Sequence, residues 1–361
     1  RELGVRANDD LTGEASPPVR ALMRLCTGVA GRPATPRCAD LELFTRGEAL
    51  FDALERAIEQ ARHHVHMEYY IWLPDATGTR LRDCLAARAE QGVEVRVLVD
   101  GFGGSAATDR FWRPLRGAGG RVERFNPLSV SRWRPRLSNF RSHRKIAVID
   151  GEVGFTGGMN ITDAQAGRGE GGAVWRDTHL GLRGPATRGL QMVFCEGWYY
   201  ATGRALDGEA YFPLPGRGGR DRRPLQIVAS GPDENCDAIH KLYASAIAAA
   251  QRRVLLSSAY FVPDAALHTA LVTAALRGVD VRVLVPAVSD LRVVAAASRS
   301  YYPELIAMGV RVFEYGPAML HAKTLVVDDL VAVVGTANCD PRSFFLNFEV
   351  VAACYRPDLC A

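Results

Sequence analysis

The stretch HRKIAVID, residues 143–150, recurs as HAKTLVVD at residues 321–328, and this recurrence decides the fold. Three further pairs of segments precede it in the same order: 57–75 with 246–264, 92–100 with 278–286, and 119–127 with 309–317. The clearest of them matches GVEVRVLVD with GVDVRVLVP. Self-similarity over about 130 residues is much longer than a solenoid repeat. The chain therefore contains a duplicated domain.

Each half alternates helical segments with short apolar strands, which predicts an α/β fold with a largely parallel sheet covered by helices. We expect an N-terminal extension, partly disordered (1–39), a first domain (40–205), a Gly/Arg/Pro-rich linker (206–224) and a second domain (225–361). The first half continues past its motif into a helical segment, whereas the second stops at Ala361. We therefore expect the second domain to lack one helix of its own repeat.

Lysine is rare in this chain, and two of its lysines occupy equivalent positions. Of the 44 basic residues only three are lysine, and Lys145 and Lys323 each follow a histidine by two residues, His143 and His321. Residues i and i+2 of a strand face the same way, so each His and Lys should project together. Arginine, a planar fork, is a poor substitute for a compact ammonium. The pairs are therefore candidate catalytic groups.

Two homologous domains related by a pseudo-twofold axis would bring both His/Lys pairs into one cleft at their interface. Two imidazoles and two ammonium groups suit a phosphodiester, with one histidine as nucleophile and the other as general acid. Asn160 and Asn338, each 17 residues after its histidine, are candidates to bind the phosphate oxygens with the lysines. This chemistry requires no metal or other cofactor. The symmetry of the repeat leaves the two histidine roles open.

Four carboxylates accompany the motifs. Asp150 and Asp328 end the motif strands, where they either orient a catalytic group or cap a turn. Asp177 and Glu349 align between the halves at 34 and 28 residues past their histidines. They are candidates to accept the imidazole N–H, the alternative being ordinary surface carboxylates.

A 12-residue insertion in the first half precedes His143 and combines arginine with aromatic residues. Such a mixture suits anionic lipid head groups at a membrane surface, although it could also bind single-stranded nucleic acid or be a solvated loop. The candidate membrane residues are Arg132, Trp133, Arg134, Arg136, Phe140 and Arg141.

The composition is that of a globular protein, with 48% hydrophobic and 23% charged residues and a net charge of +4. The eight cysteines show no Cys-x-x-Cys pair and are interpreted as free thiols in a reducing compartment. No apolar run reaches the length of a membrane span and no signal peptide is visible, although the chain begins with Arg1, so an upstream anchor could be missing.

Two other segments could suggest different sites. HHVHME (63–68) contains three histidines, but it aligns with the plain apolar segment RRVLLS of the second half, which favours a structural role over a metal site. GFGG (101–104) follows a strand but lacks the spacing of a dinucleotide or P-loop, and we interpret it as a tight turn near the cleft.

The paired motifs HRKIAVID…GGMN and HAKTLVVD…GTAN resemble the His-x-Lys-x4-Asp motifs of the phospholipase D superfamily. Within it, the segments YFVPD (260–264), SRSYYPEL (298–305) and NCDPRSFFLNFEV (338–350) are similar to bacterial cardiolipin synthases. The resemblance runs from roughly residue 40 to the end and is most specific in the paired motif.

The resemblance implies two phospholipase D-like α-β-α sandwich domains with the active site between them. It also implies transfer of a phosphatidyl group between two phosphatidylglycerol molecules through a phosphohistidine, with His143 as nucleophile and His321 as acid. The expected partners are phosphatidylglycerol and an anionic membrane surface, with no nucleic acid. We expect attachment to the cell membrane, peripheral or through an anchor outside this chain, with the catalytic domains on the cytoplasmic side. The alternatives are a phosphodiesterase that uses water as the acceptor, either a phospholipase D-type phospholipid hydrolase or a nuclease, and an inactive lipid-binding module.

Overall fold

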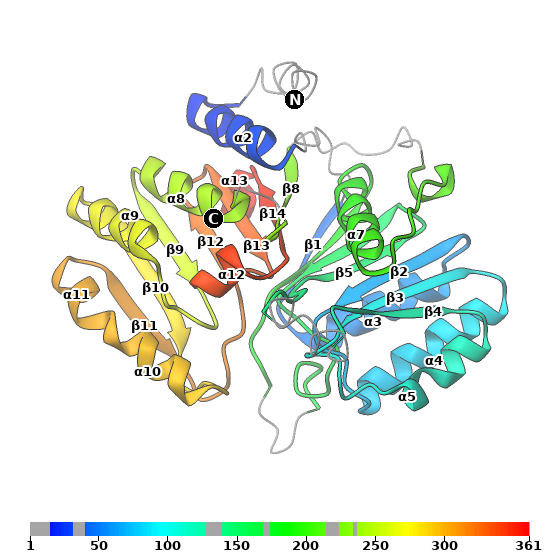
Figure 1. The fold of residues 1–361 in the computed structure, drawn as a ribbon. Coiled ribbons are helices and arrows are strands. Elements are labelled where there is room, and N and C mark those ends of the chain that lie inside the picture. Colours follow the sequence, from blue (N-terminus) through cyan, green and yellow to red (C-terminus); the bar gives the residue numbers. More distant parts are fainter. Residues whose placement is uncertain are drawn as a thin grey trace. The chain divides into compact units, whose positions relative to one another are not determined.

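The computed structural model describes residues 15–31, 40–127, 139–168, 174–213, 224–233 and 237–360. The chain divides into two compact units, one for each copy of the repeat (Figure 1). The first-motif unit comprises Cys38–Val174 and His179–Asp221. The second-motif unit comprises Arg1–Arg37, Trp175–Thr178 and Arg222–Ala361. We describe each unit by itself.

The first-motif unit is built on a seven-stranded sheet with the order β1-β7-β6-β5-β2-β3-β4. β2, β3 and β4 are parallel and alternate with helices, whereas every other neighbouring pair is antiparallel. The strands are β1 (Asp40–Phe44), β2 (His64–Tyr69), β3 (Glu94–Asp100), β4 (Arg121–Phe125), β5 (Lys145–Ile149), β6 (Val153–Gly157) and β7 (His179–Arg183). The expectation of a largely parallel sheet is therefore wrong. The motif strand β5 is joined to β6 by a tight turn, which permits only antiparallel pairing, and β7 also pairs antiparallel with β6.

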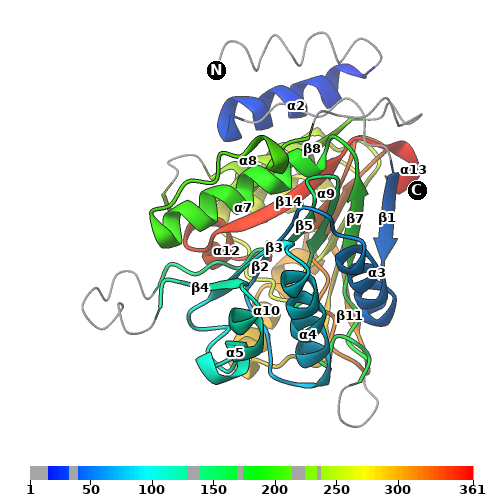
Figure 2. The same ribbon diagram turned by 90° about the vertical axis from the view of Figure 1, so that its right-hand side faces the viewer.

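Helices cover both faces of this sheet. α3 (Gly47–Glu59), α4 (Ala76–Glu90) and α5 (Asp109–Gly117) pack on one another along one face (Figure 2). α7 (Thr187–Thr202) lies across β2, β4, β5 and β6 (Figure 1). A short 3-10 helix, Glu209–Tyr211, follows it. All six residues of β2 are buried, because side chains of both faces meet a helix.

The second-motif unit has the same topology, with the strand order β11-β10-β9-β12-β13-β14-β8. β9, β10 and β11 are parallel, and the remaining pairs are antiparallel. The strands are β8 (Leu225–Ser230), β9 (Arg253–Ser257), β10 (Asp280–Pro286), β11 (Arg311–Tyr315), β12 (Thr324–Val327), β13 (Val331–Gly335) and β14 (Glu349–Cys354). The helices are α8 (Ala238–Ala249), α9 (Ala265–Leu276), α10 (Arg292–Ser300), α11 (Tyr302–Ala307), α12 (Pro341–Phe345) and α13 (Pro357–Cys360).

Equivalent aspartates start equivalent helices in the two units. Asp75 caps α4 by accepting a hydrogen bond from the Gly78 amide at 2.9 Å, and Asp264 caps α9 in the same way through Leu267 at 3.2 Å. Both belong to the repeated Pro-Asp that follows the first parallel strand. A capping carboxylate satisfies an amide that the helix itself leaves unpaired. The duplication is therefore visible down to single side chains.

Residues 17–30 do not form an extension. They fold into α2 (Pro17–Ala30), which buries Val19, Leu22, Met23 and Cys26 in the core of the second-motif unit. α2 contacts α8 and β8. An amphipathic helix gains most of its stability from such an apolar stripe, so α2 is part of this domain. Residues 1–14, 32–39 and most of the expected linker, 214–223, lie outside the described residues.

One short segment between β6 and β7 leaves the first-motif unit. Trp175–Thr178 belongs instead to the second-motif unit. Arg176 donates its amide to the Met319 carbonyl at 2.9 Å, and the His321 amide donates to the Arg176 carbonyl at 2.7 Å. The segment therefore pairs with the chain that leads into the second motif.

Candidate active site

The strand that follows each histidine fixes the His/Lys pair. Lys145 is the first residue of β5, and Lys323 immediately precedes β12. The Lys145 ammonium donates to the His143 carbonyl at 2.6 Å, and Lys323 donates to the His321 carbonyl. Lys145 is 0% and Lys323 1% exposed, and both histidines are buried. Each unit therefore holds a buried ammonium beside a buried imidazole.

His321 has a carboxylate partner from a distant part of the sequence. Its Nδ1 lies 2.6 Å from Oδ2 of Asp177, on the segment that enters the second-motif unit. The other oxygen of Asp177 accepts the Thr178 amide at 2.7 Å. Burial alone would raise the pKa of Asp177, but the nearby His321 and Lys323 hold this pKa below its ordinary value. An ionised Asp177 orients the ring, leaving Nε2 for chemistry, and stabilises its protonated form.

Lys323 lies in an acidic surrounding. Burial lowers its pKa from 10.5 to about 8, although the charges of Asp177, Glu349, Asp290 and Asp340 oppose this shift. Burial also raises the pKa of Asp340 to about 6. The ammonium therefore keeps its charge at neutral pH and loses it in mildly alkaline solution.

Tyr70 is a site residue of the first-motif unit that the sequence analysis missed. Its ring centroid lies 5.0 Å from that of His143, edge to face, and 5.3 Å from the Lys145 ammonium. Trp175 holds a similar place in the second-motif unit, 5.4 Å from the His321 ring. Tyr70 directly follows β2, the neighbour of the motif strand β5. The sequence signal that could have identified Tyr70 was its place at the end of a predicted strand of the same half as the motif.

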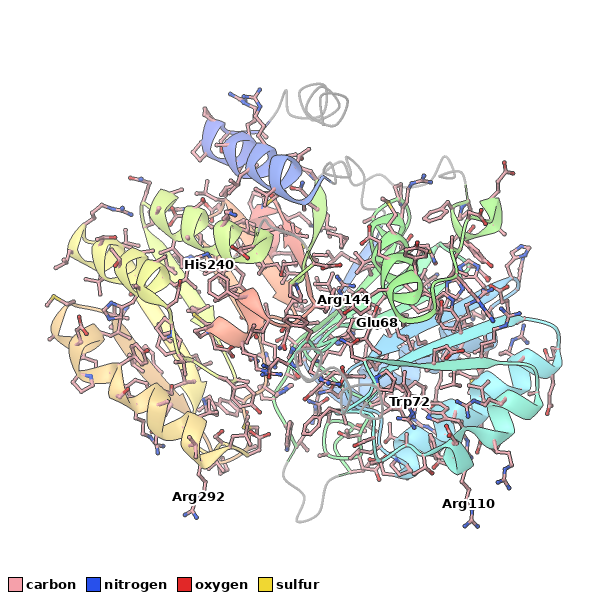
Figure 3. The ribbon with its side chains drawn as sticks, in the orientation of Figure 1. Glu68, Trp72, Arg110, Arg144, His240 and Arg292 are labelled. Carbon is pink, nitrogen blue, oxygen red and sulfur yellow. The ribbon has the colours of Figure 1, made fainter. Side chains whose placement is uncertain are left out.

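Two buried carboxylates hold the residue before His143. The Ser142 hydroxyl donates to Oε1 of Glu68 at 2.5 Å, and the Ser142 amide donates to Oδ2 of Asp100 at 3.0 Å. Burial raises the pKa of Glu68, and it raises the pKa of Asp100 to about 6. The charge of Arg144 partly offsets the shift of Glu68, and the two side chains are labelled in Figure 3. The second half has Ser257 and Pro286 at the aligned positions, so this anchor is specific to the first motif.

The two asparagines occupy equivalent places. Asn160 accepts the Ile71 amide at 3.2 Å through Oδ1, and its own amide donates to Gln165. The Asn338 amide donates to the Ser343 hydroxyl at 3.1 Å, and its buried Oδ1 has no hydrogen-bond partner among the described residues. A buried, unpaired carbonyl oxygen is costly unless a ligand or water donates a hydrogen bond to it. Asn338 is therefore a ready partner for a bound polar group.

Asp150 and Asp328 each hold a turn by accepting backbone amides, as one of the two interpretations of the sequence expects, and a catalytic role for them stays a prediction. Asp150 accepts the amides of Arg62, His63 and His64 at 2.8 to 2.9 Å. Asp328 accepts the amides of Gln251, Arg252 and Arg253 at 2.7 to 2.9 Å. Both residues have positive φ, 53° and 47°, which Asp tolerates better than most residues. They lie at the far end of the motif strand from the histidine.

Glu349, the counterpart of Asp177, starts β14 and is fully buried. It accepts hydrogen bonds from the Thr336 hydroxyl and, at 3.2 Å, from the Asn347 side chain. The expectation that Glu349 orients a histidine stays a prediction.

Only part of the Arg/aromatic insertion falls among the described residues. Arg132, Trp133, Arg134 and Arg136 lie outside them, and Phe140 is partly exposed. Arg141 is buried and donates to the Asn126 carbonyl at 2.8 Å, with Asp100 3.8 Å away. Because its guanidinium is held in the protein, Arg141 is not a lipid contact, contrary to the sequence expectation.

The HHVHME segment has a structural role. His64 and His66 hydrogen bond to the Gln191 side chain of α7, at 3.2 and 2.9 Å. Burial lowers the pKa of both imidazoles to about 3, so they are neutral. Within the described residues no group of His, Cys, Asp and Glu is arranged to hold a metal ion, and none of the helices is both long and apolar enough to cross a bilayer.

Comparison with known families and sequences gives consistent matches. The family model "Cardiolipin synthase, PLD-like domain" matches residues 54–178 and 243–361. A cardiolipin synthase of Geobacillus kaustophilus is 43% identical over 351 residues, covering 95% of this chain and 68% of that protein. Cardiolipin synthase 2 of Bacillus anthracis is 42% identical over 315 residues, covering 87% and 61%.

Solved structures support the same fold. A phosphatidylserine synthase of Haemophilus influenzae matches with a TM-score of 0.70 at 15% identity, over 93% of this chain and 87% of the other. A polyphosphate kinase of Porphyromonas gingivalis matches with a TM-score of 0.55 at 16% identity, over 98% of this chain and 51% of the other. At these identities the likeness concerns the fold alone.

Proposed function

The chain belongs to the cardiolipin synthase family of phospholipase D-like proteins, and from this premise we propose how it acts on phosphatidylglycerol. As a family member it is a phosphatidyltransferase of phospholipid biosynthesis. The proposed reaction moves a phosphatidyl group from one phosphatidylglycerol to the head-group hydroxyl of another. The products are cardiolipin and glycerol.

The observation that carries the mechanism is the hydrogen bond between His321 Nδ1 and Asp177 at 2.6 Å. A buried, ionised carboxylate on Nδ1 fixes the tautomer and favours the imidazolium, as a general acid requires. Lys323, buried beside it, keeps positive charge close to where a phosphate would bind. We therefore assign His321 as the acid and His143 as the nucleophile, with both motifs acting on one phosphate.

In the first step, the His143 lone pair attacks phosphorus and a P–N bond forms. The P–O bond to the leaving glycerol breaks, and the imidazolium of His321 gives its proton to the departing oxygen. The result is a phosphatidyl-histidine, free glycerol and a neutral His321.

In the second step, the hydroxyl of another phosphatidylglycerol attacks the phosphorus. His321 takes the hydroxyl proton, the P–N bond breaks and the His143 lone pair is restored. Cardiolipin leaves, and both imidazoles return to their starting protonation states. No group outside the two motifs needs to accept or supply a proton.

Lys145, Lys323, Asn160 and Asn338 bind the non-bridging phosphate oxygens in this proposal. Negative charge on these oxygens is held by nearby ammonium and amide donors. The place of Asn338 in the second motif, 17 residues after His321 as Asn160 is after His143, supports this role. The substrate lies in an anionic membrane, so the enzyme works at a membrane surface, and we propose the cytoplasmic side.

Product analysis tests the proposal. The protein is incubated with phosphatidylglycerol vesicles, and lipids and free glycerol are quantified over time. Cardiolipin and glycerol in equal amounts are expected. Phosphatidic acid as the main product would mean that the enzyme hydrolyses phosphatidylglycerol and does not transfer its phosphatidyl group. Cleavage of single-stranded DNA without lipid turnover would indicate a nuclease.

A further inference from the structure

A turn of the second-motif unit exposes an unusual run of apolar side chains. Between the end of β10 and the first turn of α10, Val288 is 56%, Leu291 48% and Val293 82% exposed. Single exposed apolar residues are common on protein surfaces, but three within six residues concentrate apolar side chains at one turn. The described residues place no ion pair on Arg292, which lies between the last two. Figure 3 shows its side chain extending away from the end of α10.

The turn borders the second motif. The Tyr260 hydroxyl, just after β9, donates to the Asp290 carboxylate at 2.9 and 3.0 Å. Asp290 is also near enough to Lys323 to influence its charge. Strands β9 and β10 end at this edge of the sheet, where β12 begins beside His321 and Lys323. The acidic residue of the turn thus faces the motif while the apolar ones face solvent.

The matching turn of the first-motif unit exposes one large apolar side chain. Counted from the matching strands GVEVRVLVD and GVDVRVLVP, Phe102 corresponds to Val288. Phe102 is 60% exposed, the highest value for a large hydrophobic side chain among the described residues of its unit. Asp100 Oδ1 accepts the amides of Phe102 and Gly103 at 2.8 and 3.0 Å, and Oδ2 accepts that of Ser142, next to His143. The exposed ring is therefore tied to the first motif by one carboxylate.

We propose that these two turns are the membrane-contacting tips of the protein: Val288, Leu291 and Val293 in one unit and Phe102 in the other enter an anionic phospholipid bilayer. Arg292 then pairs with a lipid phosphate. The inference rests on the proposed function, because a bilayer that supplies the substrate must meet the edges carrying the motifs. Apolar side chains in the acyl boundary together with arginine at head-group level are the usual means of interfacial binding.

Vesicle binding tests the proposal without depending on turnover. Sedimentation with phosphatidylglycerol vesicles is measured for the protein, for Leu291→Ser/Val293→Ser and for Phe102→Ser. The matched control is Leu276→Ser/Ile306→Ser, which removes two similarly exposed side chains, 66% and 56%, from helix ends that precede β10 and β11. These positions lie at the opposite edge of the sheet. All variants are compared by thermal unfolding.

The tip variants are expected to bind at least about tenfold more weakly and the control to bind like the unmodified protein. Turnover of soluble short-chain phosphatidylglycerol should stay unchanged in all of them. Equal binding by tip and control variants, or no vesicle binding by the unmodified protein, would overturn the inference. Weaker binding of the tip variants without cardiolipin formation from any substrate would support the contact and reject the proposed function.

Discussion

The two sheets have the same strand order but different interiors. In the first-motif unit every residue of β2 and β5 is buried, because helices cover both faces. In the second-motif unit β9 and β12 alternate between buried and half-exposed residues. His64, His66 and Glu68 of β2 align with Arg253, Leu255 and Ser257 of β9. The fold thus depends on one apolar face of the sheet, while the other face was free to diverge.

The surroundings of the two histidines diverged in the same way. His321 has a carboxylate on Nδ1, whereas Ser142, beside His143, is held by two buried carboxylates. The motif itself, with its lysine bonded to the histidine carbonyl, is unchanged. The His/Lys motif is therefore the same in both units, while the residues that hold the chain beside it differ: Glu68 and Asp100 of the first half align with Ser257 and Pro286 of the second.

The strongest test replaces each histidine in turn. His143→Ala and His321→Ala should each lower kcat by roughly 10³ to 10⁴, because nucleophile and acid act in one reaction. Rapid-quench trapping of labelled lipid distinguishes them: His321→Ala can still form traces of phosphatidyl-enzyme, and His143→Ala cannot. Near-normal turnover by either variant would refute the two-histidine mechanism.

Replacing Asp177, the carboxylate that contacts His321, should have the next largest effect on kcat. Asp177→Asn should lower kcat by roughly a hundredfold with little change in KM, since the amide cannot stabilise the imidazolium. The loss should be smaller for substrates whose leaving alcohol has a low pKa and needs no acid. Equal losses for both leaving groups would mean that Asp177 does not act through the acid.

The lysines test whether arginine can replace a compact charge. Lys145→Arg and Lys323→Arg should each lower kcat/KM by roughly tenfold or more, as the fork does not fit the ammonium site. With its pKa near 8, Lys323 loses its charge as pH rises through that value, so activity should fall there. Lys323→Arg should remove this alkaline limb. If the activity of this variant still fell at the same alkaline pH, Lys323 would be excluded as the group whose deprotonation causes the fall.

The motif aspartates should show the smallest effect on activity. Asp328→Ala removes the acceptor of three amides and should cost about 2 to 4 kcal/mol of stability, measured by urea unfolding. Well below the unfolding temperature its kcat should stay within about threefold of the parent. Asp150→Ala is the matched variant in the other unit. A large loss of kcat without loss of stability would support a catalytic role.

Much of the fold was predictable because its signals are local. Alternating apolar residues mark strands such as 94–100, and Pro-Asp marks the start of α4 and α9. The direction of the later strands was mispredicted, since tight turns such as Asp150-Gly151 produce antiparallel neighbours. α2 was missed because its apolar stripe becomes meaningful only beside α8.

The sequence by itself determined the duplication and the pairing of each histidine with its lysine, because two residues along a strand share a face. The tertiary structure alone decided which carboxylate serves which histidine. Asp177 follows the first motif along the chain, yet it binds His321, 144 residues away. No local pattern encodes that contact. It exists because Trp175–Thr178 leaves its own sheet and pairs beside the strand of the second motif.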